Sequence, residues 1–513
     1  MQNPLEKQSP AIPSMALRQP AIRATTLLGV AVILILAAAS YWRFIPWEPT
    51  VFYGDDLYNI LATLKDHEFI SEWHQAFTAQ FYEKYRPVFE LTWLALAKVF
   101  QFDLRGFLAF NFCLHVLNAT IFFAISMLLS KGNRLASLAL ALAFACSRFA
   151  LYQVTVATGP VEGLALTMFL LVVAFAVMAC RQPGEKRWQW LAVIAFALCV
   201  LTHERYLSIT PLLALTLALS RSRQNSGAFD RYGAAGACFA IALLNVLIKT
   251  VLLHSAFFVG TGATHLDLNV PRIIDQSEQA LLSVFGFNYG PDYLAGHSIV
   301  FDSPLPGDDL ARALASITVF CALVATIYGF TAGKQSPNGQ RWYPAFALML
   351  IILLLVPPVL TIHVEQRWLY APLAIFLSIF AWSIGLAQGR RLVPTIVCLA
   401  ACASLLTMDI LLSQYIPNIF FSSSATAARL AKRDIVDTHA APIGAELVLR
   451  ASQDVCGWAL IKGRFFELYE GTARKLYCAD TDDTFAALRR EHPLAHAFTY
   501  NHGVSFSPAN ESK

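Results

Sequence analysis

The sequence predicts an all-α polytopic membrane protein with a small soluble α+β unit at its C-terminal end. Of the 513 residues, 57% are hydrophobic and 14% charged, whereas about a quarter of the residues are charged in a soluble protein. The mean hydropathy is +0.53. The apolar residues come in blocks of roughly 20, the length that a helix needs to cross a hydrocarbon layer of about 30 Å. Beyond residue 412 the charge rises and the apolar residues thin out.

The apolar blocks predict about eleven transmembrane helices within residues 24–412. Residues 1–23 are rich in Pro, Gln and Ala, which predicts a disordered cytoplasmic tail. The first block lacks a small-residue cleavage site and is expected to remain as a signal anchor. The spans 188–203 and 206–220 are the least secure, because Pro211 and the charged "THER" interrupt their apolar run. The predicted spans are 24–42, 106–130, 134–152, 160–180, 188–203, 206–220, 232–256, 311–332, 342–361, 369–387 and 392–412.

The basic residues of the connections predict an orientation with the N-terminus inside and the C-terminus outside. The segments "KGNR", "RQPGEKR", "RSRQNSGAFDR", "GKQSPNGQR" and "QGRR" fall on one side together with the N-terminal tail. The short turns on the other side contain only Arg205 and Arg367, with Arg148 at a helix end. Cytoplasmic loops carry the excess of Lys and Arg, so the basic segments are assigned to the cytoplasm.

Three larger pieces are then expected outside, namely residues 43–105, 257–310 and 413–513. Within the first piece, "RPVFELTWLALAKVF" (86–100) is short and is interrupted by Glu90 and Lys98. It is predicted to be an amphipathic helix at the outer interface.

The C-terminal piece, 413–513, predicts a soluble outer domain of mixed structure. "SATAARLAKRDIVDTH" suggests a helix, and "ELVLRA" and "WALIKG" suggest strands. Eight of the ten cysteines lie in apolar spans, and the other two, Cys456 and Cys478, share this domain. On an oxidising side these two form a disulfide. The sequence alone leaves the bonded and the free states equally open.

Polar and charged residues gather toward the outer side of the predicted spans. Asp55 and Asp56 lie in "VFYGDDLYNI", and "YRPV" (85–88) closes the same outer piece. Two outer turns, "THERY" (202–206) and "HVEQRWLY" (363–370), each carry His, Glu and Arg. Taken singly, each feature is more simply a solvated turn or a residue satisfied by a neighbouring helix. Charges at the membrane are costly and usually face a cavity, so their convergence favours one shared outward-facing site.

A carboxylate within reach of a hydroxyl acts as a general base, and Arg and Lys bind phosphate. This combination suits sugar transfer from a lipid phosphate, with a cation stabilising the leaving phosphate. The catalytic candidates are Asp55 and Asp56. A divalent ion, Mg²⁺, Mn²⁺ or Zn²⁺, held by either aspartate stays open, because no tight ligand spacing is present. The phosphate-binding candidates are Arg367, Arg86, Arg205 and Lys249; the site-lining candidates are Tyr85, His115, Asn118, His203, Glu204, His363 and Glu365.

The acidic pair after the first span resembles that of the glycosyltransferase C superfamily, whose members use polyprenyl-phosphate-linked sugars. "YRPV" followed by "NFCLHVLN" (111–118), and later "HVEQRWLYAP", resemble blocks of protein O-mannosyltransferase-like proteins. The resemblance covers roughly residues 25–390. It implies that Asp55 and Asp56 are the catalytic acidic pair, that Arg86 borders the site, and that Arg367 binds the donor phosphate.

The sequence also departs from that family. It has no tetratricopeptide repeats, its central outer piece is short, and the usual Asp-Glu is Asp-Asp. The sugar and the acceptor are therefore open. The expected function is inverting transfer of a sugar to a hydroxyl of a polysaccharide, lipid glycan or protein. The expected location is the bacterial inner membrane, with the site facing the periplasm or exterior. Membrane lipid, donor and acceptor are the expected partners, and nucleic acid is not. The rival hypotheses are a transporter or flippase for a lipid-linked glycan, and a non-catalytic scaffold.

Overall fold

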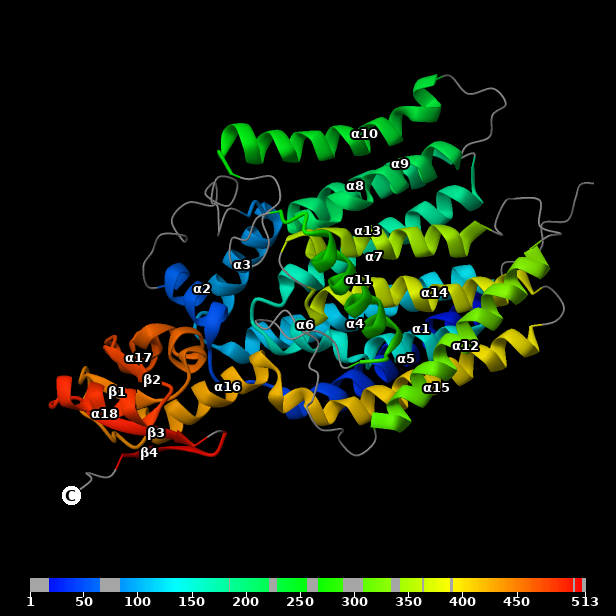
Figure 1. Cartoon of the computed structure of the whole chain (residues 1–513). Helices are drawn as coiled ribbons and strands as arrows, with labels where there is room; N and C mark the ends of the chain where they lie inside the picture. The colour runs from blue at the N-terminus through cyan, green and yellow to red at the C-terminus, as the bar shows by residue number, and fades with distance from the viewer. Residues whose placement is uncertain are drawn as a thin grey trace, which may run out of the picture.

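The computed structural model is a bundle of long helices with a small mixed unit at one end (Figure 1). The structure describes residues 18–64, 84–183, 185–220, 228–255, 266–288, 308–333, 342–361, 364–387, 391–501 and 503–509. We call residues 420–508 the C-terminal unit.

Eight helices in the described residues are long and apolar enough to cross a membrane, which makes the chain an integral membrane protein. A ninth span is formed if the bent pair Arg134–Ala145 and Arg148–Thr155, with an angle of 52°, counts as one. This pair comprises α5 (Arg134–Ala145), the 3-10 helix Arg148–Ala150 and α6 (Leu151–Thr155). The eight spans contain α1 (Arg18–Phe44), α4 (Leu104–Leu129), α7 (Pro160–Arg181), α10 (Ala228–Leu247), α12 (Asp308–Gly333), α13 (Tyr343–Thr361), α14 (Tyr370–Leu386) and α15 (Leu392–Leu412).

The number of spans differs from the expected eleven at 188–203 and 206–220. The first of these forms α8 (Lys186–Thr202), with 17 residues. The second forms a 3-10 helix (Glu204–Ile209) and then α9 (Thr210–Leu219), with 10 residues. Proline is tolerated in the first turn of a helix but not in its interior, so α9 begins anew next to Pro211. At 1.5 Å per residue, α9 covers about 15 Å, which is half of a hydrocarbon layer.

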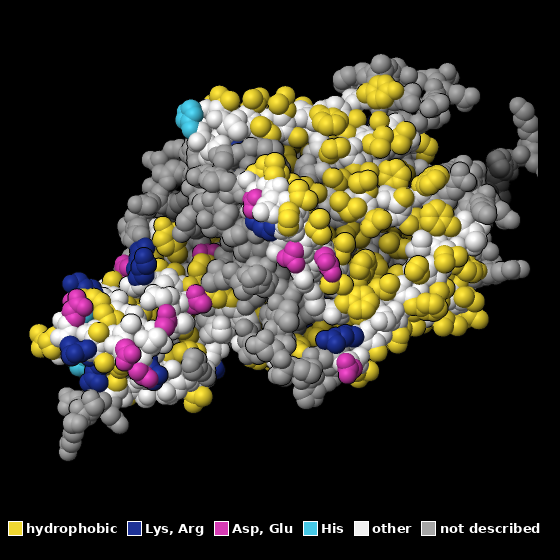
Figure 2. Space-filling view, viewed as in Figure 1, with side chains coloured by type: hydrophobic (Ala, Val, Ile, Leu, Met, Phe, Trp, Pro, Cys, Tyr) yellow, Lys and Arg dark blue, Asp and Glu magenta, His cyan; other side chains and the backbone are white. Residues whose placement is uncertain are grey.

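Helix α14 forms the centre of the bundle, with all of its residues buried. It packs against α4, α5, α12, α13 and α15. Gly385 permits one close approach, since a Cβ there would lie 1.9 Å from the carbonyl oxygen of Leu129. Hydrophobic side chains cover the flank of the bundle in Figure 2, whereas acidic and basic side chains gather over the C-terminal unit. This distribution is typical of helices surrounded by lipid.

Residues 43–105, the first of the three pieces expected outside, contribute two short helices, α2 (Gly54–Leu64) and α3 (Pro87–Phe100). Helix α3 has 14 residues, which is too few to cross a membrane. It buries Phe89 and Trp93 and leaves Val99 exposed. The helix expected at 86–100 is present as α3, but it buries Glu90 as well as apolar side chains, and its place at the outer interface stays a prediction.

In the central outer piece, α11 (Val270–Phe285) is fastened to the bundle by a buried ion pair. The Arg148 guanidinium lies 2.5 Å from Asp409 in α15. The same guanidinium donates to the carbonyl oxygens of Ser283 (2.9 Å) and Asn288 (3.1 Å). A buried ion pair persists where further hydrogen bonds satisfy it, and here those bonds hold the C-terminal end of α11.

The C-terminal unit has a four-stranded sheet in the order β2-β1-β3-β4. Strand β1 (Leu447–Arg450) runs parallel to β2 (Leu476–Ala479) and to β3 (His496–Asn501), and β4 (Ser505–Pro508) is antiparallel to β3. Leu449 stands opposite Cys478 on one side and Phe498 on the other. The helices of the unit are α16 (Phe420–Ala431), α17 (Arg464–Glu470) and α18 (Asp482–Glu491). Helix and sheet thus combine as the sequence predicts.

The strand predicted at "ELVLRA" is confirmed as β1, but the one predicted at "WALIKG" is wrong. That segment forms a π-helical turn (Asp454–Ala459) and a 3-10 turn (Ile461–Gly463). Ile461, Lys462 and Gly463 have φ values of 44°, 49° and 97°. Positive φ lies outside the β region, so these residues cannot continue a strand.

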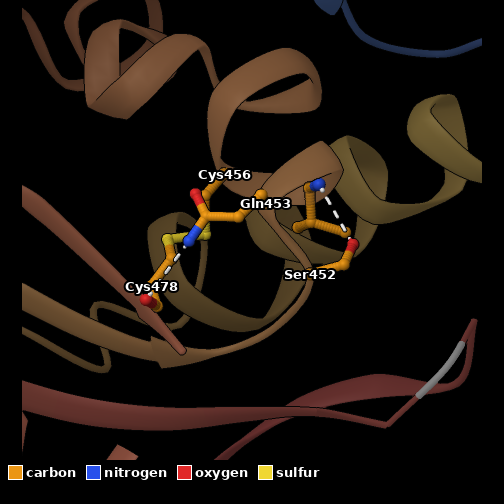
Figure 3. Close-up of a disulfide and its surroundings, with 5 residues drawn as sticks. Ser452, Gln453, Cys456 and Cys478 are labelled. Atoms are coloured by element: carbon orange, nitrogen blue, oxygen red, sulfur yellow. Dashed lines mark hydrogen bonds between the residues drawn. A yellow bond between two sulfur atoms is a disulfide. The ribbon is translucent and has the colours of Figure 1, made fainter. Parts of the chain in front are cut away.

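A disulfide joins Cys456, in the π-helical turn, to Cys478 in β2, with 6.4 Å between their Cα atoms (Figure 3). Gln453 lies beside it and donates from its amide to the carbonyl oxygen of Cys478 (3.4 Å). Two residues after Cys456, the Trp458 ring lies against Gly54. A Cβ on Gly54 would be 2.7 Å from that ring. The disulfide therefore fixes a turn that touches the first residue of α2.

Replacing Cys478 by serine is expected to lower the stability of the C-terminal unit by about 3 kcal/mol, because the bond closes a loop of 22 residues and restricts the unfolded chain. The measurement is thermal unfolding of the full chain in detergent, with and without a reductant. The reductant should lower the transition temperature of the wild type and leave that of Cys478→Ser unchanged. A wild type insensitive to complete reduction would contradict the expectation.

Candidate functional site

Asp56 is a buried anchor between α2 and the turn before α7. Its carboxylate accepts hydrogen bonds from the backbone amides of Ala157 (2.6 Å) and Thr158 (2.8 Å) and from the Thr158 hydroxyl (2.8 Å). Its side chain is 1% exposed. Asn111 holds the same turn by donating to the carbonyl oxygen of Val156 (2.7 Å). Both Asp56 oxygens are therefore occupied by groups that position the backbone.

Asp55, the preceding residue, is half-buried and has a different environment. Among the described residues its carboxylate accepts no hydrogen bond. Burial raises the pKa of Asp55 to about 6, while the charges of Arg367 and Lys84 act to lower it and that of Glu365 to raise it. An unengaged carboxylate facing cations, with a pKa below neutrality, is ionised and available as a base at pH 7.

Glu162, in the first turn of α7, connects the two outer turns that carry His, Glu and Arg. It pairs with Arg205 (2.6 Å) and lies 3.4 Å from His203, both from the turn after α8. It also accepts from the indole nitrogen of Trp368 (3.0 Å) and lies 3.8 Å from Arg367. The turns 202–206 and 363–370 both carry His, Glu and Arg, and in the structure Glu162 contacts both turns.

Arg86, just before α3, is matched by a carboxylate from the turn after α8. Its guanidinium donates to both oxygens of Glu204, at 2.8 Å and 3.2 Å, and contacts the His203 ring at 3.2 Å. Burial raises the pKa of Glu204, but Arg86 and His203 outweigh it and hold the value below its usual range, with Lys249 adding to their effect. Such two-point pairs are geometrically specific. Arg86 thus fastens the first outer piece to the turn after α8.

Arg367 lies between Glu365 (2.5 Å) and the ring of Tyr152, whose centroid is 4.3 Å from the guanidinium carbon. A cavity of about 30 Å³ adjoins it, which is roughly the volume of one water. Phe421, at the start of the C-terminal unit, and Ile419, just before it, line the same cavity. Arg367 is therefore next to both Asp55 and the C-terminal unit.

Lys84 is a site residue that the sequence reasoning missed, although it directly precedes the "YRPV" block. Burial lowers the pKa of Lys84 to about 8, together with the charges of Arg86 and Arg367, while Glu204 and Glu365 oppose the shift. Within the described part of the chain it forms no ion pair. It is therefore a cation beside Asp55 whose charge no carboxylate of the described residues neutralises directly.

Two further candidates, His115 and Asn118, lie inside the bundle on α4. His115 contacts the carbonyl oxygen of Ala145 (2.9 Å) and the Tyr370 hydroxyl (3.4 Å). Asn118 donates to the carbonyl oxygen of Gly163 (2.9 Å). Both connect helices rather than face Asp55. Of the remaining candidates, Tyr85 and Lys249 are buried, and His363 lies outside the described residues.

The described residues around the acidic pair do not fit a divalent cation. Both Asp56 oxygens accept hydrogen bonds, and Asp55 faces Lys84 and Arg367, whose charges repel a metal ion. In the described parts of the chain no group of three or more His, Cys, Asp or Glu side chains is placed to hold one. We therefore assign no step to a metal.

No family model matches the sequence, and no curated protein matches it. Among solved structures, the archaeal oligosaccharyltransferase AglB from Archaeoglobus fulgidus, in complex with an inhibitory peptide and a dolichol-phosphate, is similar with a TM-score of 0.47 and 12% identity, over 93% of this chain and 69% of that chain. The same oligosaccharyltransferase in complex with Zn and sulfate gives a TM-score of 0.44 and 10% identity, over 91% and 67%.

ArnT from Cupriavidus metallidurans, bound to undecaprenyl phosphate, has a TM-score of 0.46 and 12% identity, over 93% of each chain. Two of these three structures, that of AglB with the inhibitory peptide and that of ArnT, hold a polyprenol phosphate. With TM-scores below 0.5, these likenesses assign no activity to the present chain and no role to its residues.

Proposed function

We propose that this protein is an inverting glycosyltransferase that moves a sugar from a polyprenyl-phosphate-linked donor to an acceptor hydroxyl at the outer face of the membrane. One observation carries the proposal. Asp55 is a half-buried carboxylate without a hydrogen-bond partner in the described residues, next to Lys84 and Arg367. A base and two cations side by side are what a transfer from a phosphate leaving group needs. The resemblance of the sequence blocks to the glycosyltransferase C superfamily supports the same reaction.

In this reaction Asp55 accepts the proton of the acceptor hydroxyl as its oxygen attacks the anomeric carbon. The bond between that carbon and the phosphate oxygen breaks on the opposite face, so the configuration inverts. The electron pair leaves with polyprenyl phosphate, whose charge Arg367 and Lys84 stabilise. A pKa of about 6 keeps Asp55 ionised at pH 7 while making it more basic than an ordinary aspartate.

Fewer cations are proposed to bind the donor phosphate than the four candidates predicted from the sequence. Arg86 and Arg205 are each matched by a carboxylate, Glu204 and Glu162 respectively. We assign these two arginines to holding the outer turns in place. Lys84 has no ion pair within the described residues and is the first cation proposed to meet the donor phosphate. Arg367 is proposed as the second because it lies beside Asp55, although it also pairs with Glu365 (2.5 Å). The proposed location is a bacterial inner membrane with the C-terminal unit in the periplasm, and the sugar and acceptor stay open.

Replacing Lys84 by methionine is expected to lower kcat/KM for the donor by about 10- to 100-fold, because a hydrogen bond to a charged group contributes about 1.5–3 kcal/mol. The assay measures loss of radiolabelled sugar from a panel of polyprenyl-phosphate donors by purified protein. The panel also identifies the sugar. Methionine keeps the length of the side chain, so packing changes little.

Lys475→Met is the matched control, because Lys475 is exposed and pairs with Glu446 on the C-terminal unit. It should retain wild-type turnover. Donor loss that is equal in wild type, Lys84→Met and a sample without protein would exclude transfer and favour the scaffold hypothesis. Movement of intact donor across vesicle membranes without loss of sugar would favour a flippase.

A further inference from the structure

A second feature lies at the opposite end of the bundle from Asp55. A cavity of about 630 Å³ lies between α7, α9 and α13, with α14 as its floor. This volume is typical of sites that hold a small ligand. Its lining is mainly apolar and includes Val173, Leu213 and Phe346. Helices of a well-packed bundle leave few voids of this size, so an apolar occupant is expected.

The end of the cavity nearer Asp55 is closed. Phe169 lines it there, and its ring packs on that of Tyr206 with 5.3 Å between centroids. Both side chains are fully buried. The Tyr206 hydroxyl accepts a hydrogen bond from Arg205 (3.2 Å), the residue that pairs with Glu162. This aromatic layer separates the cavity from the candidate transfer site.

The other end carries cations. Lys131, in the turn after α4, and Arg181, at the end of α7, both line the cavity, and both are exposed. Arg391 donates to the carbonyl oxygen of Lys131 (3.4 Å). Burial and the charges of Arg181 and Arg391 lower the pKa of Lys131. Within the described residues none of these three cations forms an ion pair with a carboxylate.

Three connections of the chain are basic in sequence. The connections that follow α9, α12 and α14, residues 221–227, 334–341 and 388–391, contain Lys and Arg but no Asp or Glu. Tryptophan and tyrosine are enriched at membrane interfaces, and Trp342 and Tyr343 line the cavity. An apolar chamber with uncompensated cations at its mouth is complementary to a lipid with an anionic headgroup.

We propose that this cavity binds an anionic glycerophospholipid of the adjacent leaflet, with an acyl chain in the cavity and the phosphate at Lys131 and Arg181. The lipid is distinct from a sugar donor bound near Arg367. Arg181 lies 19 residues beyond Glu162 on the same helix, roughly 28 Å at 1.5 Å per residue. That distance is close to the thickness of the hydrocarbon layer, so the two phosphates lie at opposite membrane interfaces.

The test is the thermal stability of the full chain in detergent, titrated with phosphatidylglycerol or with phosphatidylcholine of the same acyl chains. We expect phosphatidylglycerol to stabilise the wild type at lower concentration. Lys131→Gln should weaken its apparent affinity roughly fivefold, since one basic residue near a charged lipid contributes about that factor. Arg134→Gln is the control, because Arg134 is exposed, lies two positions beyond Gly132 and does not line the cavity. It should leave the affinity for phosphatidylglycerol unchanged.

A second variant tests the cavity itself. Val173→Trp fills the cavity and should abolish the stabilisation by phosphatidylglycerol, while circular dichroism shows that the protein remains folded. Equal stabilisation by the two lipids, or an unchanged response in Lys131→Gln, would overturn the proposal. Stabilisation by undecaprenyl phosphate that Val173→Trp removes, with no response to phosphatidylglycerol, would instead assign the chamber to a polyprenyl carrier. The readout does not require transfer activity, so its failure is separate from failure of the proposed function.

Discussion

Asp55→Asn is expected to reduce sugar transfer by about 10²- to 10⁴-fold, the range that a general base contributes, while the protein accumulates and unfolds like the wild type. Asparagine has nearly the same shape but cannot accept a proton at neutral pH. No hydrogen bond within the described residues is lost, because the Asp55 carboxylate accepts none there. The measurement pairs initial rates of donor consumption with thermal unfolding of the same preparations.

The control for this variant is Asp482→Asn, a carboxylate on the exposed surface of the C-terminal unit that pairs with Arg450. It should leave the rate unchanged. The pH profile gives a second readout. Because the ionised form of Asp55 is the base and its pKa is about 6, the wild-type rate should rise with pH through about 6. It should fall again above about 8, where Lys84 loses the charge that stabilises the leaving phosphate. Transfer that survives in Asp55→Asn with the same pH profile would remove Asp55 from the mechanism.

Asp56→Asn is expected to act mainly on stability. Asparagine keeps one acceptor oxygen, but its amide group would face a backbone N–H of Ala157 or Thr158. Leaving a buried donor unsatisfied costs about 1–3 kcal/mol. Burial raises the pKa of Asp56 to about 7, while the hydrogen bonds from Thr158 and Ala157 act to lower it. Those three donors satisfy the ionised carboxylate, and a neutral amide cannot replace it.

The expected result is a lower transition temperature and lower accumulation of Asp56→Asn, with transfer reduced in proportion to the folded fraction. Thermal unfolding and the rate per folded molecule separate the two effects. Thr158→Val provides the matched control, since it removes one of the three hydrogen bonds without altering the charge. A stable Asp56→Asn with a rate per molecule as low as that of Asp55→Asn would show that both carboxylates take part in the chemistry.

Much of the architecture follows from the sequence because hydrophobic length is a strong signal. The spans from 106–130 to 392–412 were placed within a few residues wherever an apolar block was uninterrupted. At 188–220 two spans are predicted and two helices form, but the 3-10 helix Glu204–Ile209 between them leaves α8 with 17 and α9 with 10 residues, both shorter than a span of about 20. The prediction was wrong at "WALIKG", because the φ values of Ile461 and Lys462 depend on tertiary contacts that local propensity does not encode.

For the candidate site too, the sequence predicts which residues take part better than it predicts which of them come into contact. The sequence identifies Asp55 and Asp56 as a pair but gives no reason to separate them. Their surroundings differ because Asp56 meets the amides of residues 157 and 158, about a hundred positions away, and the roles proposed for them follow from that difference. Lys84 was missed because a single lysine in an outer loop carries no signal until burial is known. Glu162 precedes both turns in the sequence, and only the fold reveals that it joins them.

The contact between Trp458 and Gly54 has a consequence for biogenesis. The backbone N–H of Phe52 also donates to the Tyr469 hydroxyl (3.0 Å), so the segment leading into Asp55 rests on residues made more than 400 positions later. During synthesis the membrane helices are inserted before the C-terminal unit exists. Asp55 is therefore expected to reach its final setting only after the last strands have been made and folded and Cys456 has been oxidised. If Asp55 is the base proposed above, a partly made chain would be inactive.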